Sequence, residues 1–272
     1  MNCCICGPVK DCEKYLDKVF QNIEKIGALF DNYVIIIYYD HSTDNTLQKL
    51  IHYTIKNPRL HFHVNKTKVS PYRTHRIAKA RNYCLKEIRE KYSDYPYFIM
   101  MDFDDVNCKN VYPEILKKYI LGTNGDEWDG LSFNTSPKYY DIWGLSIKPF
   151  YFSYNHFNDN VKYYYVIQDF VTQLLNRLPP GKLLSCISSF NGFSIYKTSK
   201  FLNSYYDGRV RMDLVPKKHL DEAMAARNSP IIFQDYGNVD GNREDCEHRA
   251  FHELAIKLND AKIKISPEVL FR

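Results

Sequence analysis

Residues 97–105 read Tyr-Phe-Ile-Met-Met-Asp-Phe-Asp-Asp, an apolar run that ends in three carboxylates. A strand buried in a parallel sheet has such a continuous apolar run, and ligands bind outside the carboxyl ends of such strands. Clustered carboxylates repel one another unless a cation or hydrogen-bond donors lie between them, and oxygen ligands suit Mg²⁺ or Mn²⁺. The stretch therefore predicts a strand that ends in a cation and diphosphate site, with a solvated acidic turn as the alternative.

The composition is that of a soluble globular protein with one large α/β domain or two small ones. The chain has 272 residues, of which 44% are hydrophobic and 25% charged. Its formal net charge of +5 is spread along the chain, so we expect no nucleic-acid partner. No apolar run approaches the roughly 18 residues that a membrane-spanning helix needs, so we expect no transmembrane segment.

Eight cysteines leave two interpretations open. Cys3, Cys4, Cys6 and Cys12 could form a zinc cluster, but two of them are adjacent and their stretch has the pattern of a strand. No secretory signal precedes them, which favours buried reduced thiols in a cytoplasmic protein.

Strand and helix patterns alternate over the first hundred residues, which indicates βαβ units and a parallel sheet. The expected strands are residues 2–9, 33–39, 60–64 and 97–101, and the expected helices are residues 13–29, 73–92 and one that follows the turn at 40–46. After the acidic cluster we expect helices at 110–121 and 162–177, strands at 128–134, 187–196 and 231–233, and a last helix that begins near 245. Gly192 lies where another group should closely approach the backbone of its strand.

We find no internal repeat, linker or domain boundary, so the prediction is one α/β domain over residues 1–272. A nucleotide-binding half would cover residues 1–107 and an acceptor-binding half residues 108–272. The chain has neither the G-x-G-x-x-G nor the G-x-x-x-x-G-K-[ST] pattern. A phosphate group would therefore be held by a metal and basic side chains rather than by a glycine-rich loop.

Three motifs carry a resemblance to a known family. Residues 39–46 (YDHSTDNT) resemble the D-D-x-S-x-D-x-T turn of GT-A fold glycosyltransferases, family 2 in particular. Residues 80–85 (ARNYCL) are similar to the A-R-N-x-x-L helix of that family, and residues 102–105 (DFDD) resemble its D-x-D motif. The chain also resembles glycosyltransferase-like proteins of giant DNA viruses, which would place it in the host cytoplasm.

The resemblance implies a GT-A type fold, with a mostly parallel central sheet and helices on both faces, and a nucleotide-diphosphate sugar as donor, most often a UDP-sugar. It implies that Asp40 contacts the nucleoside and that Asp102 faces the ribose. Arg81 would lie toward the diphosphate or the base, and Asp104 would bind Mn²⁺ or Mg²⁺. The remaining donor-site residues that it implies are Pro8 and Phe103.

One departure from the family pattern affects base recognition. Tyr39 occupies the place of the first of the paired aspartates of the family, so an aromatic ring replaces one hydrogen-bond acceptor. An alternative for the same turn is that Asp40 and Ser42 merely cap the following helix.

Candidate catalytic and metal-binding residues lie at the start of the last expected helix. A transfer that inverts the anomeric centre needs a carboxylate base, and Asp245 and Glu247 are placed where this fold class has one. His248 and His252 are four residues apart and share one face of a helix. The resemblance implies that one of the two completes the coordination of the cation, and the alternatives are core packing or an independent zinc site.

An acceptor site is expected from chemistry and position. Asp141 and Trp143 lie in an aromatic segment and would form a platform on which a sugar ring stacks, although core packing of Trp143 is an equal alternative. Asn191 and Gly192 would line the same cleft.

The sequence thus predicts a metal-dependent glycosyltransferase that moves a hexose or N-acetylhexosamine to a glycan, protein or lipid acceptor. A second interpretation is a haloacid-dehalogenase-type phosphohydrolase with Asp102 as nucleophile and Asp104 as acid or base, since residues 102–106 fit D-x-D-x-[TV]. Others are a nucleotide-sugar pyrophosphorylase, which would need a glycine-rich N-terminal loop, and a carbohydrate-binding relic without turnover.

Overall fold

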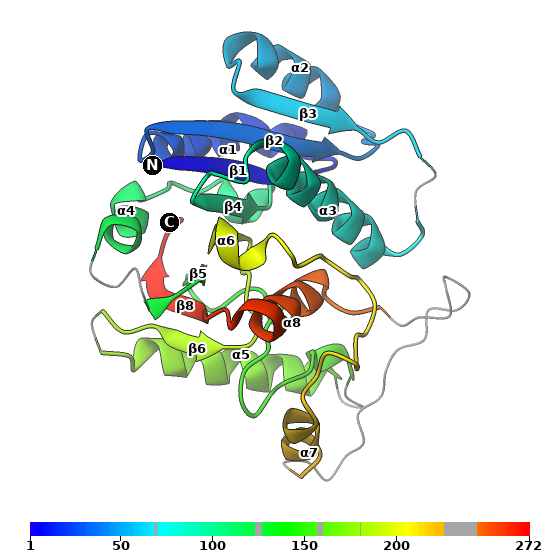
Figure 1. Cartoon of the computed structure of the whole chain (residues 1–272), viewed down its shortest axis with the longest axis vertical. Coiled ribbons are helices and arrows are strands. Elements are labelled where there is room, and N and C mark those ends of the chain that lie inside the picture. The colour runs from blue at the N-terminus through cyan, green and yellow to red at the C-terminus, as the bar shows by residue number, and fades with distance from the viewer. Residues whose placement is uncertain (68–69, 123–126, 157–159, 180, 226–243) are drawn as a thin grey trace.

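The computed structural model describes residues 1–67, 70–122, 127–156, 160–179, 181–225 and 244–272. In this part of the chain one sheet runs through the centre of the molecule, with helices on both sides of it (Figure 1). The strands are β1 (Asn2–Val9), β2 (Asn32–Tyr39), β3 (Leu60–Val64), β4 (Tyr97–Met101), β5 (Gly130–Asn134), β6 (Leu184–Cys186), β7 (Phe193–Lys197) and β8 (Ile263–Val269). Their order in the sheet is β3-β2-β1-β4-β7-β5-β8-β6.

The helices follow the strands along the chain. They are α1 (Glu13–Gly27), α2 (Thr46–Lys56), α3 (Arg73–Lys91), α4 (Pro113–Leu121), α5 (Asn160–Asn176), α6 (Thr198–Phe201), α7 (Lys217–Ala225) and α8 (Glu247–Asn259), with short 3₁₀ turns η1 (Asp105–Asn107) and η3 (Tyr154–His156).

The sheet is mostly parallel. Strands β3, β2, β1 and β4 run in one direction, and β5 pairs with β8 in parallel. Strand β7 lies antiparallel between β4 and β5, and β6 is antiparallel to β8 at the edge. The expected fold class, an α/β protein with a mostly parallel central sheet and helices on both faces, is confirmed.

Alternation along the strands creates two hydrophobic cores. On β1, Cys3 and Ile5 face one core with the apolar residues of α1, α2 and α4. Cys4 and Cys6 face the opposite core with α3, α6 and α8. All eight cysteines are free, and alternate faces of one strand cannot bring the first three into one cluster. The four N-terminal cysteines are buried free thiols, as expected, and the zinc cluster is wrong, whereas Cys108 and Cys186 are only partly buried.

The C-terminal part of the sheet differs from the sequence prediction. Of the strand expected at 187–196 only the last four residues are in a strand, β7, because Asn191 and Gly192 adopt positive φ values of 57° and 82° and form a turn just before it. The last strand, β8, was not predicted, since Lys264, Pro267 and Glu268 interrupt its apolar pattern. The strand expected at 231–233 lies outside the described residues.

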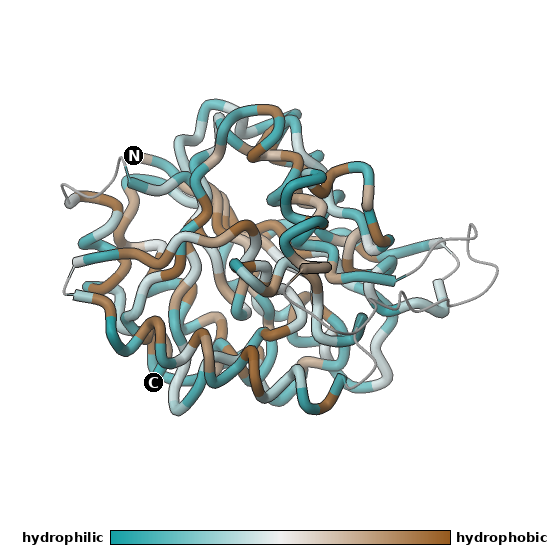
Figure 2. Tube along the Cα trace, turned by 90° about the horizontal axis from the view of Figure 1, so that it is seen from below, coloured by the Kyte–Doolittle hydropathy of each residue, from teal (hydrophilic) through white to brown (hydrophobic). Residues whose placement is uncertain are grey.

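Helix boundaries shift by a few residues for local reasons. The helix expected at 110–121 begins at Pro113, which is favoured at the first helical position. Within the described residues, no helix combines the length and apolar character that crossing a bilayer requires. Figure 2 agrees with this, since hydrophobic stretches of the trace are short and alternate with hydrophilic ones.

Candidate functional site

A pocket lies where three parallel strands end. Lys10 follows β1, Asp40 follows β2 and Asp102 follows β4. Because β2 lies on one side of β1 and β4 on the other, this is a point where the strand order reverses, and such points form crevices in open α/β sheets. The cavity has a volume of about 230 Å³. We call it the strand-end pocket, and its lining is Pro8, Val9, Lys10, Asp11, Cys12, Asp40, Arg73, Arg76, Ile77, Ala80, Asp102, Phe103 and Asp104.

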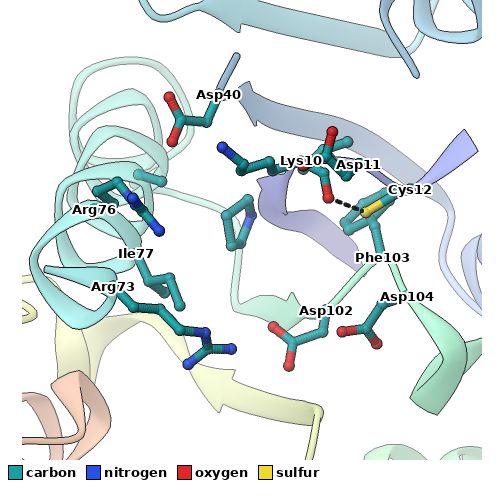
Figure 3. A pocket seen from close by; sticks show the side chains of 13 residues that line it. Lys10, Asp11, Cys12, Asp40, Arg73, Arg76, Ile77, Asp102, Phe103 and Asp104 are labelled. Carbon is teal, nitrogen blue, oxygen red and sulfur yellow. Dashed lines mark hydrogen bonds between the residues drawn. The ribbon is translucent and has the colours of Figure 1, made fainter. Parts of the chain in front are cut away.

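Opposite charges line this pocket. Arg73 and Arg76 extend into it from the start of α3, and Lys10 extends into it from the end of β1 (Figure 3). Asp102 and Asp104 lie at the end of β4 (Figure 3). The three basic side chains suit the phosphates of a ligand, as expected for a site without a glycine-rich loop.

Asp104 has an unusual proton affinity. Burial, followed by the neighbouring charge of Asp102, raises its pKa to about 7. Its Oδ1 accepts a hydrogen bond from the Val106 amide at 3.2 Å. The remaining repulsion between the two carboxylates is what a bound cation would relieve.

The donor set fits a hard cation that shares its ligands with a substrate. In the described ranges no group of three or more His, Cys, Asp or Glu side chains is arranged to hold a metal ion. Mg²⁺ is commonly bound through one or two carboxylates and completed by water and substrate phosphates. Asp102 and Asp104, facing a pocket with basic walls, match that pattern.

The turn after β2 contains one residue that lines the pocket and another that only holds neighbouring helices in place. Asp40 lines the strand-end pocket, and its Oδ1 accepts hydrogen bonds from the His41 amide at 3.0 Å and from Asn65 Nδ2 at 2.9 Å. Asp44 instead accepts hydrogen bonds from the first residues of α1 and α2, Glu13 and Thr46, each at 3.0 Å.

Helix capping does not explain the other acceptors of this turn. Ser42 Oγ accepts a hydrogen bond from the Asp11 amide at 3.0 Å, which ties the turn to the loop after β1. The Tyr39 ring packs in the core that contains α1, and its hydroxyl oxygen accepts a hydrogen bond from the Ser42 amide at 3.2 Å. The interpretation of Asp40 and Ser42 as caps of α2 is therefore wrong.

Arg81 occupies the centre of the site. It is only 2% exposed, and its Nη2 donates to Asp102 Oδ1 while its Nε donates to Glu247 Oε1, both at 2.9 Å. Its guanidinium lies over the Phe190 ring, 4.4 Å from the centroid. The sequence placed Arg81 toward the diphosphate or the base, whereas here it connects the end of β4 with the start of α8.

A second pocket adjoins the first, with Arg73, Ile77 and Asp102 lining both. Its volume is about 360 Å³. We call it the aromatic pocket, and its lining is Arg73, Ile77, Arg81, Asp102, Tyr140, Asp141, Ile142, Trp143, Tyr154, Tyr164, Phe190, Gly192, Cys246, Glu247 and His248.

The two candidate bases have different surroundings. Glu247 lines the aromatic pocket, and burial raises its pKa although Arg81 opposes the shift. Asp245 does not line that pocket. Its Oδ2 accepts from Arg249 Nε at 3.0 Å, and although burial opposes the shift, Arg249 and His156 hold its pKa below the ordinary value. Asp245 thus anchors the start of α8, while Glu247 faces the cavity.

The two candidate metal-binding histidines are also separated. Both ring nitrogens of His252 have protein partners, Ser188 Oγ at 2.9 Å and Tyr196 OH at 3.0 Å, and the ring is fully buried in the core. This placement leaves no nitrogen for a cation. His248 lines the aromatic pocket and stacks on Phe190; its ring nitrogens have no hydrogen-bond partner among the described residues, and Glu247 Oε1 lies 3.6 Å from its Nε2. Burial lowers its pKa well below the usual value, so the imidazole is neutral.

The predicted acceptor residues form one connected unit. Asn191 Oδ1 accepts from the Tyr140 and Asp141 amides at 3.1 and 2.8 Å, and its Nδ2 donates to the Phe133 carbonyl at 2.7 Å. Asn191 therefore holds the backbone of the segment that carries Asp141 and Trp143.

The glycine next to it is required by close packing. A Cβ on Gly192 would lie 2.6 Å from Val106 Cγ1, and the Gly192 carbonyl accepts the Asp102 amide at 2.9 Å. The predicted close approach at Gly192 is confirmed.

Sequence reasoning missed several lining residues. Arg73 and Arg76 were part of an expected basic helix, but nothing in its pattern indicated that its first turn faces the strand ends. Tyr164 belongs to a run of three tyrosines, and Tyr154 precedes it by ten residues. The run of three tyrosines could have indicated a ring that faces a cavity, since a helix can bury only part of such a run.

Together, the fold and the two pockets define an α/β protein with a phosphate-compatible site at its strand ends and a carboxylate-bearing site beside it. The chain belongs to glycosyl transferase family 2, whose family model matches residues 4–194. That range includes Asp40, Arg81 and the acidic cluster but ends before α8. The match and the observed sheet confirm the expected GT-A type fold class. A search of curated proteins found no match.

Solved structures with a similar chain path include residues 1–349 of TarS from S. aureus, at 14% identity and a TM-score of 0.48. The alignment covers 100% of this chain and 59% of that one. The mannosyltransferase PcManGT from Pyrobaculum calidifontis, in complex with GDP-Man and Mn²⁺, is 12% identical, with 76% and 47% coverage and a TM-score of 0.43. Glucosyl-3-phosphoglycerate synthase from Mycobacterium tuberculosis, in complex with UDP, is 12% identical, with 74% and 58% coverage and a TM-score of 0.39. This chain therefore spans less than two thirds of each of these structures.

Family membership favours a glycosyltransferase over the phosphohydrolase that the acidic cluster also suggested. The matched range contains residues 102–106, so their fit to a phosphohydrolase motif is secondary to a glycosyltransferase match that spans most of the sheet. Family membership does not distinguish an active glycosyltransferase from a carbohydrate-binding relic that has lost turnover.

Proposed function

We propose that this protein transfers a hexose or N-acetylhexosamine from a UDP-sugar to an acceptor hydroxyl, with Mn²⁺ or Mg²⁺ bound at Asp104. The observation that carries the proposal is the junction of the two pockets. Asp102 lines both, and Arg81 connects it to Glu247 through two hydrogen bonds of 2.9 Å. A donor bound at the strand ends would thus have its sugar next to a carboxylate base.

The strand-end pocket binds the nucleotide diphosphate in this proposal. Asp40, with Oδ1 held by Asn65, accepts from the base or the ribose, and Pro8 and Phe103 form the walls. Arg73 and Arg76 contact phosphate oxygens. When bound, the divalent cation would supply positive charge that stabilises the diphosphate as it leaves. His248 is the candidate histidine ligand, since His252 is engaged in the core.

Glu247 acts as the base in the aromatic pocket. Its carboxylate takes the proton of the acceptor hydroxyl while that oxygen bonds to the anomeric carbon, and the bond from this carbon to the phosphate oxygen breaks to release UDP. Oε1 is held by Arg81, whereas Oε2 lies 4.0 Å from Cys246 Sγ and is the oxygen that would take the proton from the substrate. The raised pKa makes Glu247 a stronger base than an ordinary carboxylate.

The test is release of UDP from a panel of UDP-sugars with Mn²⁺, first without and then with acceptors. We expect slow release by the parent and its loss in Asp104→Asn. The matched control is Asp105→Asn, since Asp105 is exposed and does not line the strand-end pocket. Glu247→Gln should keep UDP binding and lose transfer.

Three results would contradict the proposal. Binding of UDP-sugars without any turnover would support a non-catalytic relic. Metal-dependent hydrolysis of phosphate monoesters that disappears in Asp102→Asn would support the phosphohydrolase. Turnover that persists in Asp104→Asn would remove the role of the cation site. A viral origin and a cytoplasmic location stay predictions of the sequence.

A further inference from the structure

The aromatic pocket has walls that suit the C–H face of a sugar ring. Five aromatic side chains line it: Tyr140, Trp143, Tyr154, Tyr164 and Phe190. Phe190 is buried beneath Arg81 and His248, whereas the other four are partly or largely exposed. Tyr154 and Tyr164 pack edge to face with centroids 5.1 Å apart. Partly exposed rings from three different segments therefore converge on one cavity.

The polar groups of this pocket are mainly acceptors for hydroxyl groups. Glu247, Asp141 and Asp102 supply three carboxylates, against the two guanidinium groups of Arg73 and Arg81. Arg81 is already engaged with two of these carboxylates, and Arg73 also lines the strand-end pocket. In the proposed function Arg73 would contact the donor diphosphate, and the carboxylates outnumber the guanidinium groups in this lining, so an anionic acceptor would be disfavoured relative to a neutral one.

Several buried polar atoms of this pocket lack a hydrogen-bond partner among the described residues, including Arg81 Nη1 and both ring nitrogens of His248. The indole nitrogen of Trp143 is buried and has no hydrogen-bond partner among the described residues. An orphaned buried N–H costs free energy unless a ligand or a water satisfies it. The cavity of about 360 Å³ lies at the small end of the roughly 300–1,000 Å³ typical of small-molecule sites.

We propose that the acceptor is a neutral sugar ring, bound in the aromatic pocket against Tyr164 and Trp143 with one hydroxyl at Glu247. This inference rests on the proposed function and narrows its acceptor from glycan, protein or lipid to a carbohydrate without charged groups. Tyr164 is here a binding residue for the acceptor and has no part in binding the donor.

The experiment measures UDP release with the UDP-sugar and Mn²⁺ that give turnover in water alone. The acceptor probes are methyl glycosides of glucose, galactose, mannose and N-acetylglucosamine, with 3-phosphoglycerate and a Ser/Thr peptide as contrasting probes. We expect at least one methyl glycoside to accelerate UDP release by about tenfold or more, because a bound hydroxyl replaces water as the nucleophile.

Tyr164→Ala supplies the residue-level test. It should raise the KM for that glycoside by about fivefold, in the range of a lost aromatic contact, and leave the affinity for UDP unchanged. Tyr165→Ala is the matched control, since Tyr165 follows on the same helix, is 57% exposed and does not line the pocket.

The outcomes separate this inference from the proposed function. Absence of both UDP-sugar binding and UDP release would remove the two together. Normal hydrolysis with acceleration by 3-phosphoglycerate or the peptide, and by no glycoside, would overturn the sugar acceptor alone. Equal KM values for the Tyr164 and Tyr165 variants would overturn it as well.

Discussion

Replacing Arg81 by glutamine tests the connection between the two pockets. Arg81→Gln removes the cation that lies 2.9 Å from both Asp102 and Glu247. The side chain of Glu247 is 5% exposed, so its carboxylate would lose its charged partner without gaining water. Removing one partner of a buried ion pair costs about 3–5 kcal/mol. For a domain of this size, where 1 kcal/mol shifts Tm by about 2–4 °C, the expected decrease is roughly 6–20 °C.

The stability lost in Arg81→Gln should depend on pH, and the pKa of Glu247 determines the direction of that dependence. Burial already raises the folded-state pKa of Glu247, and Arg81 is the main group that opposes this shift. Without Arg81 the pKa rises further, so the native state binds more protons than the unfolded state above the unfolded pKa of about 4.3. The free energy of unfolding then falls as pH rises. The variant should therefore differ least from the parent near pH 4 and most at neutral pH.

The assay is thermal unfolding from pH 4 to 8, together with transfer kinetics. The limb of the pH–rate profile that reports ionisation of Glu247 should move to higher pH in Arg81→Gln. The double variant Arg81→Gln/Glu247→Gln should recover much of the lost stability and none of the activity. Lys86→Gln is the control, since Lys86 is exposed on the same helix and lies 3.8 Å from Glu90. An Arg81→Gln protein with unchanged Tm and an unmoved limb would refute the reasoning.

Three further predictions concern other parts of the chain. Burial raises the pKa of Glu253 to about 8, so its ionisation destabilises the fold as pH rises from about 4 to 8, and Glu253→Gln should raise Tm at pH 8 but not at pH 4. Gly7→Ala should lower the yield of folded protein or its Tm strongly, because its Cβ would lie 2.0 Å from the Met101 carbonyl oxygen. His252→Ala should lower the free energy of unfolding in urea by about 2–4 kcal/mol without changing the Mn²⁺ requirement. His248→Ala should instead weaken Mn²⁺-dependent turnover. A loss of Mn²⁺-dependent turnover in His252→Ala but not in His248→Ala would contradict the placement of both rings.

Much of the fold could be predicted because the first half of the chain repeats one simple pattern. Short apolar runs such as residues 33–39 and 97–101 are typical of strands buried on both faces, and the helices between successive strands indicate parallel pairing. The second half lacks such runs. Strand β8 carries Lys264 and Pro267 because it pairs with the short β6 near the edge of the sheet, where strands need less apolar character.

Some residues of the site could also be predicted from the sequence, whereas others depend on the tertiary fold. Asp40, Asp102 and Asp104 could be brought together from sequence, since parallel strands end at one edge of the sheet. Which of Asp245 and Glu247 faces the cavity could not, because the answer depends on Arg249, which pairs with Asp245 from one helical turn away. Arg81 shows the same limit. Its helix was correctly predicted, but only the tertiary fold brings α8 within reach of its guanidinium.

The central claim is that the carboxylates at the end of β4 bind a divalent cation together with the diphosphate of a nucleotide sugar. The most direct measurement is the anomalous scattering of manganese in crystals soaked with UDP and Mn²⁺. The account predicts a peak within coordination distance of Asp104, with UDP phosphate oxygens as its other ligands and the base near Asp40. A well-ordered UDP bound elsewhere, or a strand-end pocket that holds neither manganese nor UDP, would contradict it.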